Sequence, residues 1–331
     1  MKKIIVIGAT SNVGSYFTFW ARDYFKGKYE IIATGRKSTD FFTHNDITYV
    51  QLDITNVDGF SRLPQEGVHA VVMMAAAAPS YMSHYDPRSY LDVNITGTFN
   101  VLEYCMRVKA DRVLFMQTTY DIWNCVLRGE TIRPNTVPDY SYTGDHAVYV
   151  ISKNAGIELL EHYRQEYGLK TFVFRFPTIY NYSPYHYYYP NGKKTLRPIY
   201  RMIENAMQSK PIEIWGDPRK AKDMVYVADC SQMLCKAIDV NIAHGYYNVG
   251  TGVPVTLEEQ VKTIIEVFSP QNAPSEIIYC PEKKSGGFCV MDIENAKEEL
   301  GYVPEYDCRR LFEAYKEEMR LNRFAPILNR D

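Results

Sequence analysis

Two residues of the sequence, Tyr149 and Lys153, have the types and the spacing for acid–base chemistry. They lie four positions apart in the run Tyr-Val-Ile-Ser-Lys, so a helix would place the phenol and the ammonium on one face. A neighbouring ammonium stabilises the phenolate and lowers the pKa of a tyrosine from about 10 toward the working range, which would make Tyr149 a general acid and base for a substrate hydroxyl. A chain with 28 tyrosines also contains such spacings by chance, as surface pairs. The position of the pair in the fold must therefore decide between the two interpretations.

A glycine-containing turn near residue 10 suits a dinucleotide. The apolar run at residues 4–7 leads into Gly8 and, after a turn that ends at Gly14, into a segment with helical period. Gly8 permits a tight turn, Gly14 permits close approach of helix and strand, and the free N–H groups at the start of a helix attract a pyrophosphate. An ordinary glycine turn is the alternative, and the position after the first strand of a sheet favours the dinucleotide. We expect the cofactor to contact Gly8, Thr10, Ser11, Asn12, Val13 and Gly14.

The end of the second predicted strand bears on which dinucleotide binds. An NAD site would have an acidic residue here against the ribose hydroxyls, but the sequence has Arg36 followed by Lys37. Arg36 would pair with a 2′-phosphate, which favours NADP over NAD. The alternative is a solvated basic turn.

The elements that must position these residues follow from the pattern of apolar residues. Short continuous apolar runs suit strands buried on both faces, and the segments between them, such as residues 94–107 and 148–167, carry the helical period. This alternation predicts an α/β fold with a Rossmann-type doubly wound parallel sheet. The predicted strands are residues 4–7, 31–34, 48–51, 70–74, 113–117 and 171–174.

The second half of the chain has a different composition. Residues 180–192 are dense in turn formers and have no useful periodicity, which predicts a long loop. Helices are predicted at 198–208, from 228 onward and at 308–322, with a strand at 212–215. We expect an NAD(P)-binding Rossmann domain over residues 1–175 and a smaller, mixed α/β, substrate-binding domain over residues 176–331, with some of the chain crossing back near residues 220–245.

Composition and charge exclude several classes of function. The 331 residues are 46% apolar, and 37 basic against 39 acidic side chains leave a formal charge of −2, so nothing drives binding to nucleic acid or to a membrane surface. No run approaches the roughly 20 apolar residues of a membrane span, and Met1-Lys2-Lys3 precedes a strand-length apolar run rather than the core of a signal peptide. The seven cysteines are scattered without metal or redox spacing, which indicates reduced thiols, no metal site and a cytoplasmic location.

Further motifs follow the glycine turn in a characteristic order. They are Asp53 in Gln-Leu-Asp-Ile, the run 74–78, the segment 93–103, Arg175-Phe-Pro-Thr-Ile-Tyr180, and the segments 216–229, 247–252 and 292–304. On these motifs the sequence resembles the extended short-chain dehydrogenase/reductase family, in particular its nucleotide-sugar epimerase/dehydratase branch, over essentially its whole length.

The resemblance implies a catalytic set and two groups of binding residues. Thr119 would hydrogen-bond the reacting sugar oxygen while Tyr149 moves the proton, with Thr118 as the alternative threonine. Lys153 would also hold the nicotinamide ribose. The further cofactor contacts implied are Asp53, Ile54, Ala75, Ala76, Ala77, Asn94 and Phe176, and the substrate contacts are Ala78, Thr119, Thr178, Lys222 and Lys284.

The sequence also departs from the family pattern. Ser11 replaces the middle glycine of the turn, where its hydroxyl would become a phosphate ligand. Thr178 replaces a common asparagine, and Lys222 replaces the usual diphosphate-binding arginine, so a bidentate pair becomes a point charge. Lys283 or Lys284 would supply a second basic contact.

The residues after Thr119 bear on the reaction. Sugar 4,6-dehydratases of this family need an acid pair or a glutamate two positions after the threonine; here Asp121 takes the glutamate place but is shorter, and Tyr120 cannot replace a second acid. We therefore rank an NAD(P)-dependent nucleotide-sugar epimerase first. The alternatives are an NADPH-dependent reductase of a keto-sugar nucleotide or another carbonyl, a 4,6-dehydratase, and a non-catalytic NADP sensor.

Two surface features remain open in the sequence. The tyrosine-rich loop 180–190 suits either a substrate lid or a segment packed on the second domain, and His186 within it is interpreted as packed rather than catalytic. The helices at 94–107 and 148–167 resemble the pair that forms a dimer interface in this family, so we expect a homodimer.

Overall fold

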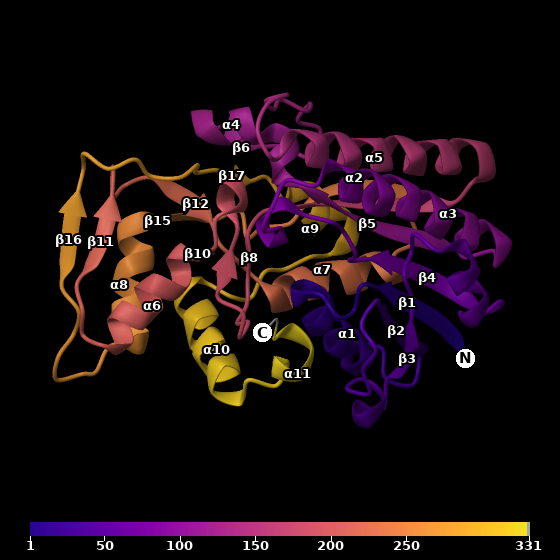
Figure 1. Ribbon diagram of the computed structural model, residues 1–331, viewed down its shortest axis with the longest axis horizontal. Coiled ribbons are helices and arrows are strands. Elements are labelled where there is room, and N and C mark those ends of the chain that lie inside the picture. Colours follow the sequence, from indigo (N-terminus) through magenta and orange to yellow (C-terminus); the bar gives the residue numbers. More distant parts are fainter. Residues whose placement is uncertain (330–331) are drawn as a thin grey trace.

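The structure, a computed structural model, describes residues 1–329 and has a seven-stranded parallel sheet at its centre (Figure 1). The strands lie in the order β14-β7-β5-β4-β1-β2-β3, and each neighbouring pair is parallel. Their carboxyl ends therefore share one edge, the edge at which sheets of this kind bind ligands. The strands are β1 (Lys2–Ile7), β2 (Tyr29–Gly35), β3 (Thr48–Gln51), β4 (Val68–Met73), β5 (Arg112–Thr118), β7 (Lys170–Phe176) and β14 (His244–Asn248).

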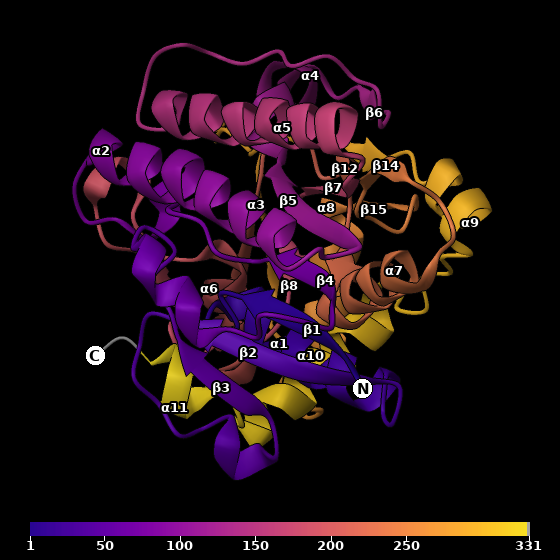
Figure 2. The same ribbon diagram turned by 90° about the vertical axis from the view of Figure 1, so that its right-hand side faces the viewer.

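Helices cover both faces of the sheet, because its strands are apolar on both sides. Along β1, Ile4 and Val6 join the apolar cluster beneath α1 (Asn12–Tyr24) and α7 (Val227–Asp239), whereas Ile5 and Ile7 join the cluster beneath α3 (Gly97–Arg107) and α5 (Ala147–Tyr167). Figure 2 shows α3 and α5 side by side over one face. The doubly wound fold expected from the sequence is thus confirmed.

The chain beyond β7 forms smaller units beside the sheet (left in Figure 1). Two-stranded pairs and helices alternate there, while α7 and β14 return to the main sheet. The pairs are β8 (Ile179–Tyr180) with β13 (Val225–Tyr226), β9 (Tyr187–Tyr188) with β10 (Thr195–Leu196), β11 (Ile212–Trp215) with β16 (Ile277–Cys280), β12 (Ala221–Asp223) with β15 (Pro254–Thr256), and β6 (Thr131–Ile132) with β17 (Val290–Met291). The remaining helices are α2 (Pro87–Tyr90), α4 (Trp123–Arg128), α6 (Pro198–Met207), α8 (Leu257–Phe268), α9 (Glu294–Leu300), α10 (Cys308–Leu321) and α11 (Ala325–Leu328).

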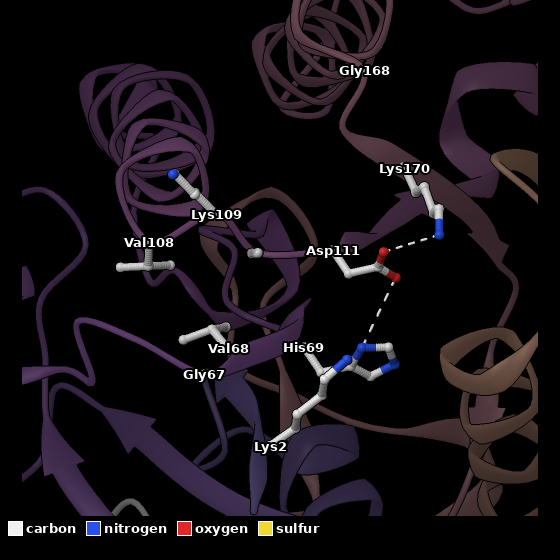
Figure 3. Close-up of a pocket in the computed structure, with 10 residues that line it drawn as sticks. Lys2, Gly67, Val68, His69, Val108, Lys109, Asp111, Gly168 and Lys170 are labelled. Atoms are coloured by element: carbon white, nitrogen blue, oxygen red, sulfur yellow. Dashed lines mark hydrogen bonds and ion pairs between the residues drawn. The ribbon is translucent and has the colours of Figure 1, made fainter.

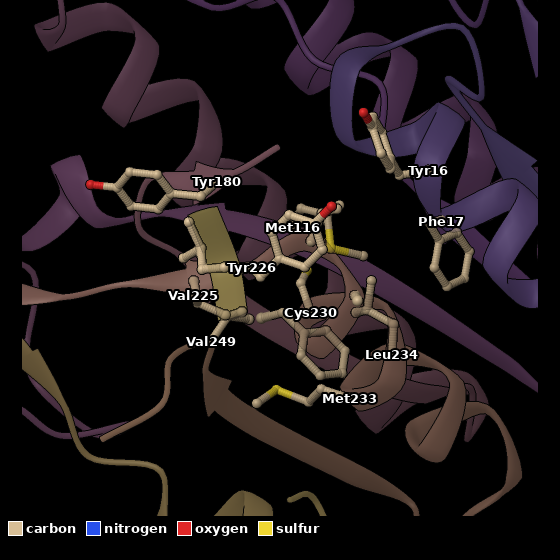
Figure 4. Packing of buried hydrophobic residues seen from close by; sticks show 14 of the residues in the cluster. Tyr16, Phe17, Met116, Tyr180, Val225, Tyr226, Cys230, Met233, Leu234 and Val249 are labelled. Carbon is tan, nitrogen blue, oxygen red and sulfur yellow. The ribbon is translucent and has the colours of Figure 1, made fainter. Parts of the chain in front are cut away.

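One continuous apolar core joins the two halves of the chain. Phe17 of α1, Met116 of β5 and Met233 of α7 belong to it, together with Val225 and Tyr226, which lie just before α7 (Figure 4). The same cluster includes buried residues of α8 and α10. The halves therefore pack as one body, and the domain boundary between residues 175 and 176 stays a prediction.

The predicted elements are found, with informative differences at their ends. Each of the six predicted strands is present within two residues of its predicted ends. The helix predicted at 94–107 instead begins at Pro87, and a π-helical turn at Leu91–Thr96 interrupts it. Pattern alone did not predict α8 or the return of β14 to the sheet. Within residues 1–329, no helix is long and apolar enough to cross a membrane.

Candidate active site

The turn between β1 and α1 is built for a close approach of backbone to ligand. Gly8 has φ +88°, and a Cβ there would lie 2.6 Å from the backbone nitrogen of Ala75. A Cβ on Gly14 would lie 2.3 Å from the Gly8 carbonyl oxygen. Ser11 is the N-cap of α1, and its hydroxyl oxygen accepts a hydrogen bond from the Gly14 N–H at 3.1 Å. The Ser11 hydroxyl thus has a structural role, and the N–H groups of Asn12 and Val13, in the first turn of the helix, have no acceptor within residues 1–329 and suit an anionic ligand.

The alanine run after β4 is fixed by Asn94. The Asn94 amide oxygen accepts from the Ala77 N–H at 2.8 Å, and its amide nitrogen donates to the Ala77 carbonyl and to the Ser152 hydroxyl, both at 3.0 Å. Asn94 lies in the π-helical turn and is 2% exposed. Because both amide hydrogens are used, the arrangement makes Asn94 a positioning residue that holds the alanine run against α5, and its contact with the cofactor stays a prediction.

Tyr149 and Lys153 lie on the buried face of α5, next to the carboxyl end of β5. The Lys153 ammonium lies 3.9 Å from the centroid of the Phe115 ring, and a Cβ on Gly156 would lie 2.7 Å from the same ring, so a glycine allows α5 this close to the strand. Tyr149 is 9% exposed and Lys153 4%. Within residues 1–329 the Lys153 ammonium has no hydrogen-bond acceptor. A buried ammonium needs oxygen acceptors, and the hydroxyls of a ribose would supply them.

The titration of this pair differs from the sequence-based expectation. Burial raises the pKa of Tyr149 to about 12, and a hydrogen-bonding contact with the Thr118 side chain partly opposes the rise. Burial lowers the pKa of Lys153 to about 7. In the protein alone the pKa of Tyr149 is therefore raised, not lowered as expected from the sequence, because loss of water outweighs the contact with Thr118.

The two candidate threonines differ in their contacts. Thr118, the last residue of β5, is the threonine that acts on the pKa of Tyr149, and its hydroxyl oxygen accepts from the Tyr120 N–H at 3.2 Å. Thr119 is 8% exposed and begins a 3-10 turn, Thr119–Ile122. The structure thus brings both threonines to the end of β5 beside Tyr149, and the choice of Thr119 over Thr118 stays a prediction.

Asp121 is held in a buried ion pair. Nε and Nη2 of Arg175 donate to Asp121 Oδ2 at 3.3 and 3.2 Å, and the side chains of Arg175 and Asp121 are 2% and 1% exposed. Burial raises the pKa of Asp121, and the Arg175 charge opposes the rise. The remaining Arg175 donors reach Asn248 and the carbonyls of Arg133, Pro134 and Thr136. Arg175 of β7 therefore connects the turn after β5, through Asp121, with β14, through Asn248.

The adenosine end of the predicted cofactor site has one cation without a partner. Arg36 follows β2 and is exposed, and its guanidinium has no partner among the described residues. Lys37 instead donates to the carbonyls of Ile327 and Asn329, at 3.0 and 3.4 Å. Asp53, after β3, accepts from the N–H and hydroxyl of Thr55 through one oxygen, which leaves the other available. Ile54 is 5% exposed, and Phe176 ends β7.

The predicted substrate residues outside the sheet are more scattered. Thr178 is exposed, and Lys222, on β12, lies with its ammonium 5.7 Å from the centroid of the Tyr180 ring. Lys283 is paired with Glu213 at 2.5 Å, which leaves the exposed Lys284 as the second basic candidate. Ala78 lies at the end of the alanine run, in the apolar cluster around Tyr149.

Sequence reasoning missed several residues around Tyr149. The His146 ring packs against Tyr120 in a tilted arrangement with centroids 4.1 Å apart, and it lies 6.4 Å from the Tyr149 ring. Its Nδ1 is 2.5 Å from Asp145. The position of His146 three residues before Tyr149 on a helical start is a signal that could have found it. Tyr81 also acts on the pKa of Tyr149, but it comes from a distant part of the chain.

The tyrosine-rich loop 180–190 was expected to be either a substrate lid or a packed segment, and its two parts differ in this respect. Its first part is packed, since Tyr180 and Tyr182 are buried and His186 stacks on Tyr200 with centroids 4.1 Å apart. Its second part is the hairpin of β9 and β10, where Tyr187 is 39% exposed.

A separate cavity lies at the opposite, amino edge of the sheet (Figure 3). Asp111 pairs there with Lys170 at 2.9 Å and lies 3.9 Å from His69. His69 and Arg112 bind carbonyls at the end of α7, so the cluster fixes that helix. None of the predicted site residues lines the cavity.

The fold and the glycine turn define a dinucleotide-binding α/β protein of the doubly wound class. A family model described as the NAD dependent epimerase/dehydratase family matches residues 4–250. The chain belongs to this family, as the resemblance predicted, and is an enzyme of the extended short-chain dehydrogenase type.

Known proteins of this family show two reaction types. The chain is 27% identical over 259 residues to a UDP-glucuronate 4-epimerase of Thermodesulfobacterium geofontis, covering 78% of this chain and 74% of that protein. It is 24% identical to a dTDP-glucose 4,6-dehydratase of Escherichia coli, covering 71% and 69%. The solved structure of a UDP-glucuronic acid 4-epimerase from Bacillus cereus in complex with NAD superposes with a TM-score of 0.73, at 20% identity and 96% and 99% coverage. At this identity, the match to the Bacillus cereus structure supports the fold alone.

Proposed function

We propose that this enzyme epimerises a nucleotide sugar by reversible hydride transfer at one sugar carbon. The observation that carries the proposal is the difference in surroundings between the Tyr149–Lys153 pair and Asp121, all near the end of β5. Tyr149 and Lys153 are both buried, and within residues 1–329 the lysine has no acceptor, whereas Asp121 is bound through Oδ2 to Arg175. An elimination of water needs a carboxyl group beside the sugar, and Asp121, 1% exposed, has one of its two oxygens in the ion pair with Arg175.

The residues of the chain divide the work of this reaction. Tyr149 takes the proton of the sugar hydroxyl as the carbon is oxidised and returns it as the carbon is reduced. Lys153 stabilises the phenolate that forms on Tyr149, and Thr119 or Thr118 orients the sugar oxygen. The burial of all these side chains keeps water from the reacting atoms.

The residues present fit a nicotinamide dinucleotide. The glycine turn and the first N–H groups of α1 would hold its pyrophosphate, and Lys153 would bind the nicotinamide ribose. When bound, the nicotinamide supplies the hydride acceptor and donor. Arg36 supports NADP because its guanidinium is exposed and without a partner among residues 1–329.

Arg36 also favours a second candidate, the NADPH-dependent reduction of a keto-sugar nucleotide. The two reactions use the same residues and differ in whether the hydride returns to the same sugar molecule. The non-catalytic sensor has little support, because a sensor has no need of the buried Tyr149–Lys153 pair.

The reactions are separated by incubating the enzyme with NAD or NADP and UDP-glucose, UDP-glucuronate or dTDP-glucose in deuterated water, followed by NMR. Epimerisation gives the C4 epimer with hydrogen retained on carbon and no net change in nicotinamide absorbance. Stoichiometric reduction of NADP to NADPH with release of a keto sugar, the reverse of carbonyl reduction, would indicate the reductase. A 4-keto-6-deoxy product carrying solvent deuterium would indicate the dehydratase, and either result would overturn the epimerase.

We also propose that the enzyme is a cytoplasmic homodimer. The face that carries α3 and α5 exposes Phe99 and Ile151, 44% and 40% exposed, in support of an interface there. Phe99→Glu should convert the dimer to a monomer in light scattering, and a monomeric wild-type protein would refute the proposal.

A further inference from the structure

Arg197 is a partly buried cation without a carboxylate partner among residues 1–329. It connects β10 to α6, and its guanidinium lies 5.4 Å from the centroid of the Tyr81 ring and 5.6 Å from that of the Tyr188 ring. In the part of the chain that the structure describes, no acidic group lies within ion-pair distance of it and no acceptor receives its side-chain N–H groups. An arginine has five such donors, so ring contacts alone leave the edges of the guanidinium for an anion.

Arg197 differs in this respect from the buried arginines. Each nitrogen of the Arg175 guanidinium donates to an oxygen, and Arg112 donates to Asp111 and to the carbonyls of Ala237 and Val240. These two arginines join elements of the fold. Within residues 1–329 the guanidinium N–H groups of Arg197 join no elements, which is expected of a side chain that binds a ligand.

The hairpin that carries Arg197 is fastened over the site. The Tyr189 N–H donates to the Ser80 carbonyl at 3.2 Å, and the Asn191 N–H donates to the Asp145 carboxylate at 3.2 Å. Ser80 follows the alanine run, and Asp145 lies four residues before Tyr149. Two hydrogen bonds thus fix the hairpin to the segments on either side of the predicted reacting carbon.

Two tyrosines connect Arg197 with Tyr149. Tyr81, whose ring the guanidinium covers, is close enough to Tyr149 to raise its pKa, and so is Tyr120. Burial raises the pKa of Tyr120, and the Arg197 charge opposes the rise. The guanidinium thus lies over Tyr81 on the Tyr149 side of the hairpin, which supports a place beside the sugar ring rather than at the remote end of a nucleotide.

The nucleotide diphosphate has a different cation. Lys222, its candidate ligand by family resemblance, lies on β12 and contacts Tyr180. A neutral sugar would bury Arg197 without an anion, which costs free energy, whereas a sugar carboxylate would accept two parallel hydrogen bonds from the guanidinium. The free energy lost with a neutral sugar and the hydrogen bonds gained with an acidic sugar both favour binding of the acidic sugar.

We propose that Arg197 binds a carboxylate on the sugar ring, so that the substrate is a nucleotide-activated uronic acid. The proposal rests on the proposed function, because it assumes a sugar bound at Tyr149.

The test compares matched acidic and neutral ligands. Binding of UDP-glucuronate against UDP-glucose, and of dTDP-glucuronate against dTDP-glucose, is measured by calorimetry with the cofactor present, in the wild-type protein, R197Q, R197K and R201Q. Arg201 is an exposed arginine one turn later on α6 and serves as the matched control. Thermal unfolding of each variant verifies the fold.

In the wild-type protein, at least one acid should bind more tightly than its neutral partner. R197Q should weaken that acid by roughly 10- to 100-fold, as expected for a charge-assisted bidentate pair, and leave the neutral sugar and UDP within about threefold. R197K should give an intermediate loss and R201Q none. Equal weakening of acid, neutral sugar and UDP would place Arg197 on the diphosphate and overturn the proposal, as would the absence of any preference for an acid in the wild-type protein.

Turnover separates this proposal from the proposed function. Tight, Arg197-dependent binding of an acid without any epimerisation would refute the epimerase and keep the uronate site. Epimerisation of UDP-glucose that R197Q leaves unchanged, with no binding or turnover of UDP-glucuronate, would refute the uronate site and keep the epimerase.

Discussion

Two buried cations on neighbouring elements of the same sheet edge, Arg175 and Lys153, have opposite surroundings. Arg175 on β7 is 2% exposed, pairs with Asp121, and has an acceptor for each of its nitrogens. Lys153 on α5 is 4% exposed, its ammonium lies over the Phe115 ring without a hydrogen-bond acceptor among residues 1–329, and its pKa is lowered to about 7. The sheet thus holds one cation that is fully satisfied and one that is not.

The difference indicates what each cation is for. A buried charge with all its partners is part of the framework, since removing one partner leaves the other uncompensated. A buried ammonium without acceptors costs stability that folding must supply elsewhere, and such groups are concentrated at functional sites. The same distinction separates Arg197 from Arg112, and Arg36 from Lys37.

The strongest test of the functional side of this comparison is Tyr149→Phe. Loss of the phenol removes the proposed acid and base, so kcat for epimerisation should fall by roughly 10²- to 10⁴-fold while cofactor affinity stays within about threefold. Steady-state kinetics by NMR and cofactor titration by fluorescence give the two quantities. Tyr90→Phe, which changes the tyrosine ring packed 5.9 Å from Tyr149, is the matched control and should retain most activity. Full turnover by the Tyr149 variant would show that another group moves the proton.

Arg175→Met tests the framework side through stability. It leaves Asp121 buried without its partner and should lower the free energy of unfolding by about 3–5 kcal/mol in urea denaturation. Adding Asp121→Asn should recover part of the loss. The control is Arg219→Met, whose pair with Asp217 is exposed and worth about 0–1 kcal/mol. A loss no larger than that of the control would mean that the buried pair does not support the fold.

The fold was largely predictable from the sequence because its signals are local. Apolar runs such as residues 4–7 mark strands buried on both faces, and the glycine turn marks the first crossover. The return of β14 was less accessible, since His244–Asn248 contains two tyrosines, a glycine and an asparagine rather than an apolar run. Its pairing with β7 depends on contacts across about 70 residues of chain, which no local pattern records.

The site was predictable in part, for the same reason. Tyr149 and Lys153 are one helical turn apart, so spacing alone places them together, and the structure brings Thr118 and Thr119 beside them. Spacing does not show that Asp121 is taken by Arg175 or that Tyr81 and Arg197 approach from distant segments. Nor does it give the direction of a pKa shift, because burial is a property of the whole fold.

Lys153→Met sharpens the comparison through the pH dependence of stability. The pKa of Lys153 is about 7 in the folded protein and about 10.5 in the unfolded chain. Between these values the unfolded chain binds the extra proton, so the free energy of unfolding of the wild-type protein rises with pH, by up to about 1.4 kcal/mol per pH unit. The difference between wild type and Lys153→Met should therefore increase from pH 7 to pH 9 in favour of the wild type.

The titration of Tyr149 has the opposite sign at higher pH. Its folded pKa of about 12 exceeds the unfolded value of about 10, so its contribution is lost as pH rises above 10. Measurements by urea unfolding should therefore stop near pH 9. Lys26→Met, at an exposed position, should leave a constant difference from the wild type. A constant difference for Lys153→Met as well would contradict the lowered pKa and remove the contrast with Arg175.

At the surface, Arg36 and Lys37 differ in the same way as Lys153 and Arg175. The effect expected from their substitution, a change in cofactor affinity, is the smallest of those predicted. The exposed Arg36 has no partner in the described chain, and Lys37 is bound to the Ile327 and Asn329 carbonyls. If Arg36 pairs with the 2′-phosphate of NADP, Arg36→Ala should weaken NADP by about tenfold at low salt and leave NAD unchanged, because one exposed charge-assisted contact is worth about 1–2 kcal/mol. Lys37→Ala should change the affinity for NADP by less than about threefold. Unchanged affinity for NADP in Arg36→Ala would assign Arg36 to the solvated basic turn, and equal weakening of NAD and NADP would place it on a group that both cofactors share; either result would remove the support for NADP.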